Sequence, residues 1–194
     1  MAAGVRGKRQ VAARAEPRVD PRTLAQPIAQ ELNAVLHQEQ RIREAIERAD
    51  LPFAEVSDEV DTFVRAAEKT AGRAQLLYEY LTDQDPRYVE ERLRAVKLAA
   101  ESGNESQKAL AEALTAQLEA MRKAEHKLQA FYTEMERIGV ELGNIRGQLL
   151  SVSAASESES QRELAAGVRD LREQIGAVAD GMSEVLDQTG AKPA

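Results

Sequence analysis

The sequence predicts an all-α protein, an elongated antiparallel helical bundle of coiled-coil type in which one long helix forms the spine. The main observation is a line of apolar residues, mostly three or four positions apart, from Leu114 to Val152. One polar residue, Gln117, interrupts it, and we interpret that position as partly exposed to solvent. Such spacing puts a narrow apolar stripe on a long helix, which must then pack against other helices. The stripe consists of Leu114, Met121, Ala124, Leu128, Phe131, Met135, Ile138, Leu142, Ile145, Leu149 and Val152.

Composition supports the same class. Aromatic residues make up only 4% of the 194 residues and tryptophan is absent, which favours narrow helical seams over a thick core. Cysteine is absent, so disulfides, thiolate nucleophiles and cysteine-based zinc sites are excluded. No apolar run approaches the ~18 residues of a membrane-spanning helix, and no signal peptide is recognisable. We therefore expect a cytoplasmic protein.

Charge is unevenly distributed along the chain. The formal net charge is -7, but residues 1–22 hold six basic and two acidic residues, a net +4, so the remainder carries -11. An acidic body repels nucleic acid and anionic lipid over most of its surface. Residues 1–19 show no apolar period, and we expect a disordered basic tail.

Residues 20–84 are predicted to form an N-terminal helical hairpin. The first helix begins at Asp20-Pro21, or one turn later at Pro27, because aspartate caps helices and proline suits the first helical position. It ends near Asp50, because Pro52 disfavours helical geometry at the preceding residue, Leu51.

The second helix of this hairpin begins at Phe53 or Ser57 and ends near Leu81, before the Asp-Gln-Asp-Pro run at 83–86. Its stripe is thin around Thr70. The stripe consists of Val56, Val60, Phe63, Ala67, Ala74, Leu77 and Leu81.

The segment 85–153 is predicted to hold the spine. The polar run at 102–106 is typical of a turn, yet the heptad phase of the apolar positions is preserved across it. We slightly favour one continuous coiled-coil helix, with a kink allowed at Gly103-Asn104. The alternative is that Gly103-Asn104 forms the tip of a hairpin.

The rest of the chain is predicted to be a Ser/Glu linker at 154–160, a helix at 161–188 that packs back on the spine, and a frayed end at 189–194. We expect the N-terminal hairpin to cover one end of the spine and the last helix to cover the other.

No catalytic, cofactor-binding or metal-binding residues are predicted. His37 and His126 belong to neither a Glu-x-x-His pair nor a His-Glu-x-x-His motif. The serines near 151–160 lack the Gly-x-Ser-x-Gly elbow of hydrolases. We therefore expect no enzyme and no cofactor.

Three glycines recur at every fourth position, at 139, 143 and 147. Each costs a helix about 0.8–1.0 kcal/mol relative to alanine. We hypothesise that another helix, of this chain or of a second copy, approaches closely there; the alternative is a soft hinge. The candidate helix-packing and interaction residues are Leu128, Phe131, Met135, Ile138, Leu142, Ile145, Leu149, Gly139, Gly143 and Gly147.

The stretch KLAAESGNESQKALAEALTAQLEAM, from Lys97 to Met121, resembles the hairpin-tip region of phage-shock-protein-A-type membrane-remodelling proteins. There, too, an Ala-rich helix meets a short polar turn and then an Ala/Leu/Glu helix. The resemblance implies a membrane-surface scaffold. Residues 1–19 depart from that family because they lack an amphipathic apolar face, and Pro52 and Pro86 interrupt the region where the family has one long helix.

The sequence thus predicts a non-catalytic structural or interaction protein that acts through helix–helix packing and self-associates. Its expected partner is a protein or a second copy of itself. The alternatives are a membrane-surface scaffold and a nucleic-acid-associated protein that uses the basic N-terminal arm; nucleic acid and membrane are both disfavoured as partners.

Overall fold

The structure, a computed structural model, describes residues 18–49, 53–101, 105–151 and 157–190. These residues form helices joined by short connections and contain no strand, so the predicted all-α class is confirmed. The elements are the 3-10 helix η1 (Pro21–Thr23) and the α-helices α1 (Gln26–Ala49), α2 (Ala54–Asp83), α3 (Pro86–Ala100), α4 (Glu105–Leu149) and α5 (Glu157–Thr189).

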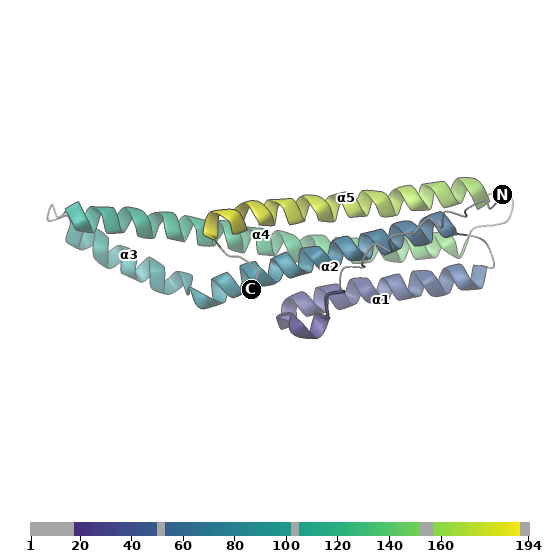
Figure 1. Ribbon diagram of the computed structural model, residues 1–194, viewed down its shortest axis with the longest axis horizontal. Helices are drawn as coiled ribbons and strands as arrows, with labels where there is room; N and C mark the ends of the chain where they lie inside the picture. Colours follow the sequence, from purple (N-terminus) through teal and green to yellow (C-terminus); the bar gives the residue numbers. More distant parts are fainter. Residues whose placement is uncertain (1–17, 50–52, 102–104, 152–156, 191–194) are drawn as a thin grey trace, which may run out of the picture.

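Four helices form the body of the molecule: α1, α2, α5 and the C-terminal part of α4 (Figure 1). Both α1 and α5 pack against α2 and against α4, whereas α2 and α4 contact each other less and lie diagonally across the bundle. The core between them is apolar, and its largest fully buried side chains include Phe53, Phe63 and Phe131. Burial of these stripes holds the four helices together.

The second part of the molecule is a two-helix projection, which we call the arm: α3 and residues 105–121 of α4 (Figure 1). It has a small core of its own. That core consists of Val89, Leu93, Ala111, Leu114, Leu118 and Met121.

The predicted continuous helix over 85–153 is wrong. Two helices, α3 and α4, replace it, and they pack against each other as in the hairpin alternative. Gly103-Asn104, the predicted tip, lies outside the described residues. The heptad phase did not decide between the two structures. The stripes before and after the turn can pack against each other in a hairpin, or both can pack against another helix as one continuous stripe.

The prediction that the last helix covers the far end of the spine is wrong. Instead α5 lies on the body beside α2 and α4, so the arm has no helix over it in the described part of the chain (Figure 1). The spine itself is α4, which begins at Glu105 rather than at 85.

Two predicted caps are present. The carboxylate of Asp20 accepts a hydrogen bond from the backbone N–H of Arg22 at 2.9 Å and starts η1, after which α1 begins at Gln26. The carboxylate of Asp85 likewise accepts from the N–H of Arg87 at 2.9 Å and starts α3. Each satisfies a backbone donor that has no partner within the first turn.

Other boundaries differ from the prediction. Helix α2 extends from Ala54 to Asp83, and α5 begins at Glu157, inside the predicted 154–160 linker. At the N-terminus, Arg18 and Val19 pack on the body rather than belonging to a free tail. Residues 1–17 and 191–194, which hold most of the predicted tail and frayed end, lie outside the described residues.

The apolar stripe of α4 changes direction where the arm joins the body. Leu118, Met121 and Ala124 are buried at two successive steps of three residues, so the stripe rotates around the helix. In the arm Leu118 is buried instead of Gln117, whose half-exposed side chain donates from Nε2 to Oε1 of Gln84 at 2.5 Å. The seam therefore faces α3 in the arm and the other body helices beyond it.

Candidate interaction surface

The seven apolar residues predicted as interaction residues all lie in the core of the body. Their side chains pack between α4 and the neighbouring helices, and none is more than 8% exposed. They hold the chain's own helices together and present no surface to a partner. These residues are Leu128, Phe131, Met135, Ile138, Leu142, Ile145 and Leu149.

The three glycines lie on a different side of α4, where Gly139 and Gly143 face α1 and Gly147 is exposed. A Cβ atom placed on Gly139, Gly143 or Gly147 would meet no other described atom within 4 Å. The prediction that another helix of this chain approaches closely there is therefore wrong; an approach by a second copy stays a prediction. Gly139 and Gly143 instead line a groove of about 370 Å³ between α1 and α4.

Acidic side chains border that groove. Burial, and then the nearby carboxylate of Glu136, raise the pKa of Glu31. Burial also raises the pKa of Tyr132, with smaller contributions from Tyr78 and Glu31. Two carboxylates of like charge at one groove form a loosely packed, acidic contact between α1 and α4 rather than a helix-docking surface.

The arm has two unlike faces. One is polar: α3 and α4 there enclose a groove of about 300 Å³, where Arg94 donates to Glu90 at 3.0 Å. Its ionisable residues carry both signs and come from both helices. They are Glu90, Arg94, Lys97, Glu119 and Arg122.

The other side of the arm, which we call the apolar face, is rich in alanine. Positions three or four apart share one side of a helix, and this spacing brings the alanines of α3 and α4 to the side opposite the polar groove. Its single charged residue is Arg92. The face consists of Tyr88, Arg92, Ala95, Val96, Ala99, Ser106, Ala109, Leu110, Ala113, Ala116, Gln117 and Ala120.

Large apolar side chains are exposed mainly on the arm. Tyr88 is 62% exposed, Leu110 is 38% exposed, and Leu98, on the outer side of α3, is 71% exposed. Elsewhere in the described chain the large apolar residues in this class are Val140 and Leu150. Three of these five exposed residues thus lie on the arm, which is the smaller of the two packed parts of the molecule.

In the body, α5 covers the side of α4 that becomes the apolar face in the arm. A Cβ atom on Gly181 of α5 would lie 2.8 Å from Nζ of Lys127, so the side chain of Lys127 lies against α5 there. Ala120 and Ala113 precede Lys127 by seven and fourteen residues and so lie on the same line of α4. Because α5 ends at Thr189, no described helix covers this line along the arm (Figure 1).

Comparison of the chain with protein-family models, curated proteins and solved structures finds no match in any of the three.

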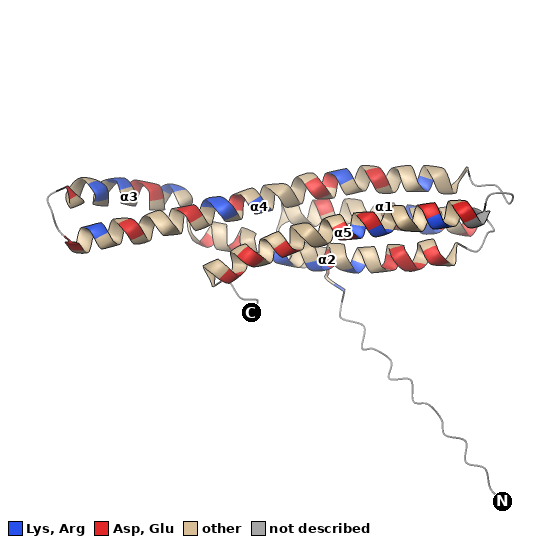
Figure 2. Ribbon diagram, turned by 90° about the horizontal axis from the view of Figure 1, so that it is seen from above, with Lys and Arg blue, Asp and Glu red and all other residues tan. Residues whose placement is uncertain are grey.

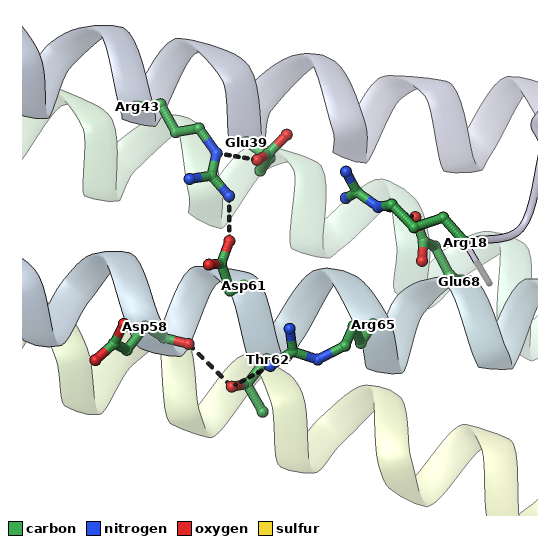
Figure 3. A network of polar contacts seen from close by, with 8 residues as sticks. All are labelled: Arg18, Glu39, Arg43, Asp58, Asp61, Thr62, Arg65 and Glu68. Carbon is green, nitrogen blue, oxygen red and sulfur yellow. Dashed lines mark hydrogen bonds and ion pairs between the residues drawn. The ribbon is translucent and has the colours of Figure 1, made fainter. Parts of the chain in front are cut away.

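Polar contacts elsewhere link the body helices. Figure 3 shows Arg43 of α1 between Glu39 and Asp61. The hydrogen bond that Arg43 donates to the Glu39 carboxylate is the main reason that the pKa of Arg43 is raised. Arg18 pairs with the buried Glu68 at 3.0 Å.

A similar contact joins α2 to α5, where Glu59 accepts hydrogen bonds from Arg169 at 2.8 Å and Arg172 at 3.1 Å. Charges of both signs are spread along the helices (Figure 2). These cations already have carboxylate partners, so we assign the contacts to stability.

A basic cluster lies where α5 ends. Arg122, Lys123, His126 and Lys127 of α4 border a pocket of about 430 Å³ together with Glu184 and other residues of the last turns of α5. Lysine and arginine side chains at a helix C-terminus offset its partial negative charge, which accounts for the position of Arg122, Lys123 and Lys127.

Two kinds of site are absent from the described residues. No group of three or more His, Asp or Glu side chains is placed to hold a metal ion. None of the helices described is apolar over a length that could cross a bilayer.

Sequence reasoning missed the apolar face. A signal was present, because alanines recur at 109, 113, 116 and 120 with helical spacing beside the stripe. Alanine is common both in helix cores and on helix surfaces, so the pattern did not say which residues would remain uncovered.

Proposed function

We propose that this protein is a non-catalytic interaction protein of the cytoplasm, which binds a helical partner through the apolar face of its arm. One observation carries the proposal: α5 lies over the side of α4 that bears Lys127 in the body and ends before the arm, where no described helix covers Ala113 and Ala120 on the same line. An uncovered apolar surface on a soluble helix pair favours association.

The chemistry of the described residues supports a binding role. The carboxyl and phenol groups with shifted pKa values, such as Glu31 and Tyr132, owe the shift mainly to partial burial between helices. The arginines with shifted pKa values are paired with carboxylates. Catalysis needs ionisable groups that converge in a water-excluding cleft, and these groups lie on separate helix contacts.

Arg92, the one cation of the apolar face, offers little to a nucleic acid or an anionic membrane, which bind through clusters of Lys and Arg. The nucleic-acid alternative rests on basic residues at 1–17, outside the described residues. Both alternatives stay predictions.

Photocrosslinking tests the proposal. The chain has no cysteine, so Ala109→Cys at the edge of the apolar face can carry a thiol-linked benzophenone. Ala166→Cys, an exposed alanine on α5, is the matched control. The labelled full chain is irradiated in an extract of the cells that make it.

We expect adducts with protein from position 109 and none from position 166. Adding Ala113→Glu at the centre of the face should remove them, because a charge on the apolar surface opposes docking. Equal labelling from both positions, or no adduct from 109, would overturn the proposal.

A further inference from the structure

We propose that α1 works as a flap: it stays joined to α2, swings away from α4 when the carboxylates between α1 and α4 ionise, and closes when they are protonated. The proposal goes beyond the proposed function and does not depend on it, because the arm takes no part in the movement. Two observations carry it, namely the unlike polar contacts on the two sides of α1 and the loose packing beside this helix.

On the side of α2, polar contacts hold α1 in place. The guanidinium of Arg43 of α1 donates to the carboxylate of Asp61 of α2 (Figure 3). Just before the other end of α1, the backbone N–H of Ala25 donates to Oε1 of Gln75 at 2.7 Å. Because these contacts lie toward opposite ends of α1, they form a line along which the helix stays attached to α2.

On the side of α4, a carboxylate of α1 faces like charge. Glu31 of α1 and Glu136 of α4 border the same groove, and Glu136 is close enough to help raise the pKa of Glu31. Among the described residues neither carboxylate has a hydrogen bond or an ion pair, and no such contact joins α1 to α4. In this part of the chain, burial of apolar side chains is therefore what holds α1 against α4.

The packing beside α1 leaves room for movement. Grooves of about 370 Å³ and about 390 Å³ lie on its α4 and α2 sides. The first is bordered by Gly139 and Gly143, where an added Cβ atom would meet no other described atom within 4 Å. Gln38 borders it too, and its buried Oε1 atom has no hydrogen-bond donor in the described chain. A buried acceptor without a donor is destabilising, so opening of the groove relieves that cost by letting water reach this oxygen.

The groups around Glu31 set the direction of the pH effect. Glu136 and Tyr132 of α4 face it, and Tyr78 of α2 interacts with Tyr132. A phenol is uncharged near neutral pH, so the charge that Glu31 meets is the carboxylate of Glu136. When α1 opens, Glu31 gains water and leaves this charge, so the closed state binds a proton more tightly than the open state. Protonation therefore closes the flap, and this stabilisation is lost as pH rises through the raised pKa of Glu31.

Hydrogen exchange followed by mass spectrometry tests the flap in the full chain, with protection factors corrected for the effect of pH on intrinsic exchange. From about pH 5 to about pH 7 we expect the protection of residues 26–38 to fall at least about twofold relative to that of α5. Glu31→Gln should keep α1 protected at both pH values. His37→Gln, which removes the exposed histidine of α1, should leave the fall unchanged.

A second variant, Glu136→Gln, removes the opposing charge from the other helix and should reduce the fall, because Glu31 then meets no like charge across the groove. Circular dichroism checks that each variant folds. A fall of equal size in α1 and α5 would indicate global unfolding and would overturn the inference. So would an unchanged or rising protection of α1, or a fall that survives Glu31→Gln.

Discussion

At the scale of single residues, Glu68 shows how this fold accommodates a buried charge. Its side chain is 7% exposed, and Oε1 accepts from Nε of Arg18 at 3.0 Å, which fastens the segment before α1 to α2 (Figure 3). A groove of about 390 Å³ adjoins the pair. The contact therefore stabilises the fold modestly, because water can reach the carboxylate when the arginine is removed.

Arg18→Ala should lower the free energy of unfolding by about 1 kcal/mol, near the lower end for a buried polar group that loses a partner. Chemical denaturation measures the change. Arg65→Ala is the control, because Arg65 is exposed and donates to the hydroxyl of Thr62 at 3.2 Å; it should change stability by less than about 0.5 kcal/mol. Equal losses would contradict the assigned role of Arg18.

Gly143 should be replaceable by alanine with a gain. No described atom lies within 4 Å of the added Cβ, and the residue is inside α4, so Gly143→Ala should raise the free energy of unfolding by about 0.5–1 kcal/mol. Thermal or urea denaturation checks this. Gly190→Ala should instead destabilise the chain, because Gly190 has a φ of 70° just after α5. A loss at Gly143 would favour a close contact there with a second copy.

Glu31 predicts a pH dependence. Burial, then Glu136, raise its folded-state pKa above the ordinary 4.5, so the folded chain binds this proton more tightly than the unfolded chain. Ionisation therefore costs stability at neutral pH. Glu31→Gln should raise the free energy of unfolding at pH 7, and the gain should shrink as pH falls through the raised pKa towards about 4, where both states are protonated. Urea titrations at several pH values, with exposed Glu47→Gln as control, test this; a gain that grows on acidification would refute it.

At the scale of elements, α4 serves two structures in turn. Its C-terminal part is enclosed by the body helices, and its N-terminal part packs on α3 in the arm. Leu142 in the body is fully buried, whereas Leu118 in the arm is 7% exposed. The arm should therefore be the less stable end of the same helix.

Matched truncations measure that difference. Leu142→Ala should cost about 3–4 kcal/mol, within the range for fully enclosed leucines, and Leu118→Ala about 1–2 kcal/mol because the thin arm can collapse around the gap. Denaturation at low protein concentration avoids any contribution from association. Hydrogen exchange should be faster in α3 and residues 105–121 of α4 than in α2 and the rest of α4. Equal costs and equal exchange would contradict a two-part α4.

Local signals predicted the elements well where a cap or a proline acts. Asp20, Asp85 and Pro86 lie at helix starts as expected, because each acts within one turn of backbone. The prediction of a continuous helix was wrong because it gave weight to the heptad phase, which a hairpin satisfies equally well. The polar, turn-forming residues at 102–106 were the better signal. Choosing between them requires knowing whether α3 packs on α4, a contact between segments that the phase does not encode.

At the scale of the whole molecule, the chain should be elongated. The 45 residues of α4 span about 68 Å, whereas a compact globule of 194 residues has a radius of gyration of about 16 Å. Small-angle scattering at low concentration should give a radius above about 20 Å and a maximum dimension above about 68 Å. A value near that of a globule would be incompatible with a projecting arm.

The candidate surface was the least predictable feature. The seven apolar residues predicted for interaction, from Leu128 to Leu149, are buried within the chain, because the strongest apolar stripe is also the one most completely covered. The weaker alanine pattern of the arm is covered by none of the described helices, because α5 ends at Thr189. Which stripe a chain uses internally depends on the lengths and positions of its other helices.

The sequence by itself determined that this protein is helical, where several helices begin, and which residues form apolar stripes, because caps, prolines and helical periodicity act over one or two turns. Only the tertiary structure decided that α3 packs on α4, that α5 joins the body, and that none of the described helices covers one side of the arm. Those outcomes depend on contacts summed between distant segments, which no local spacing records.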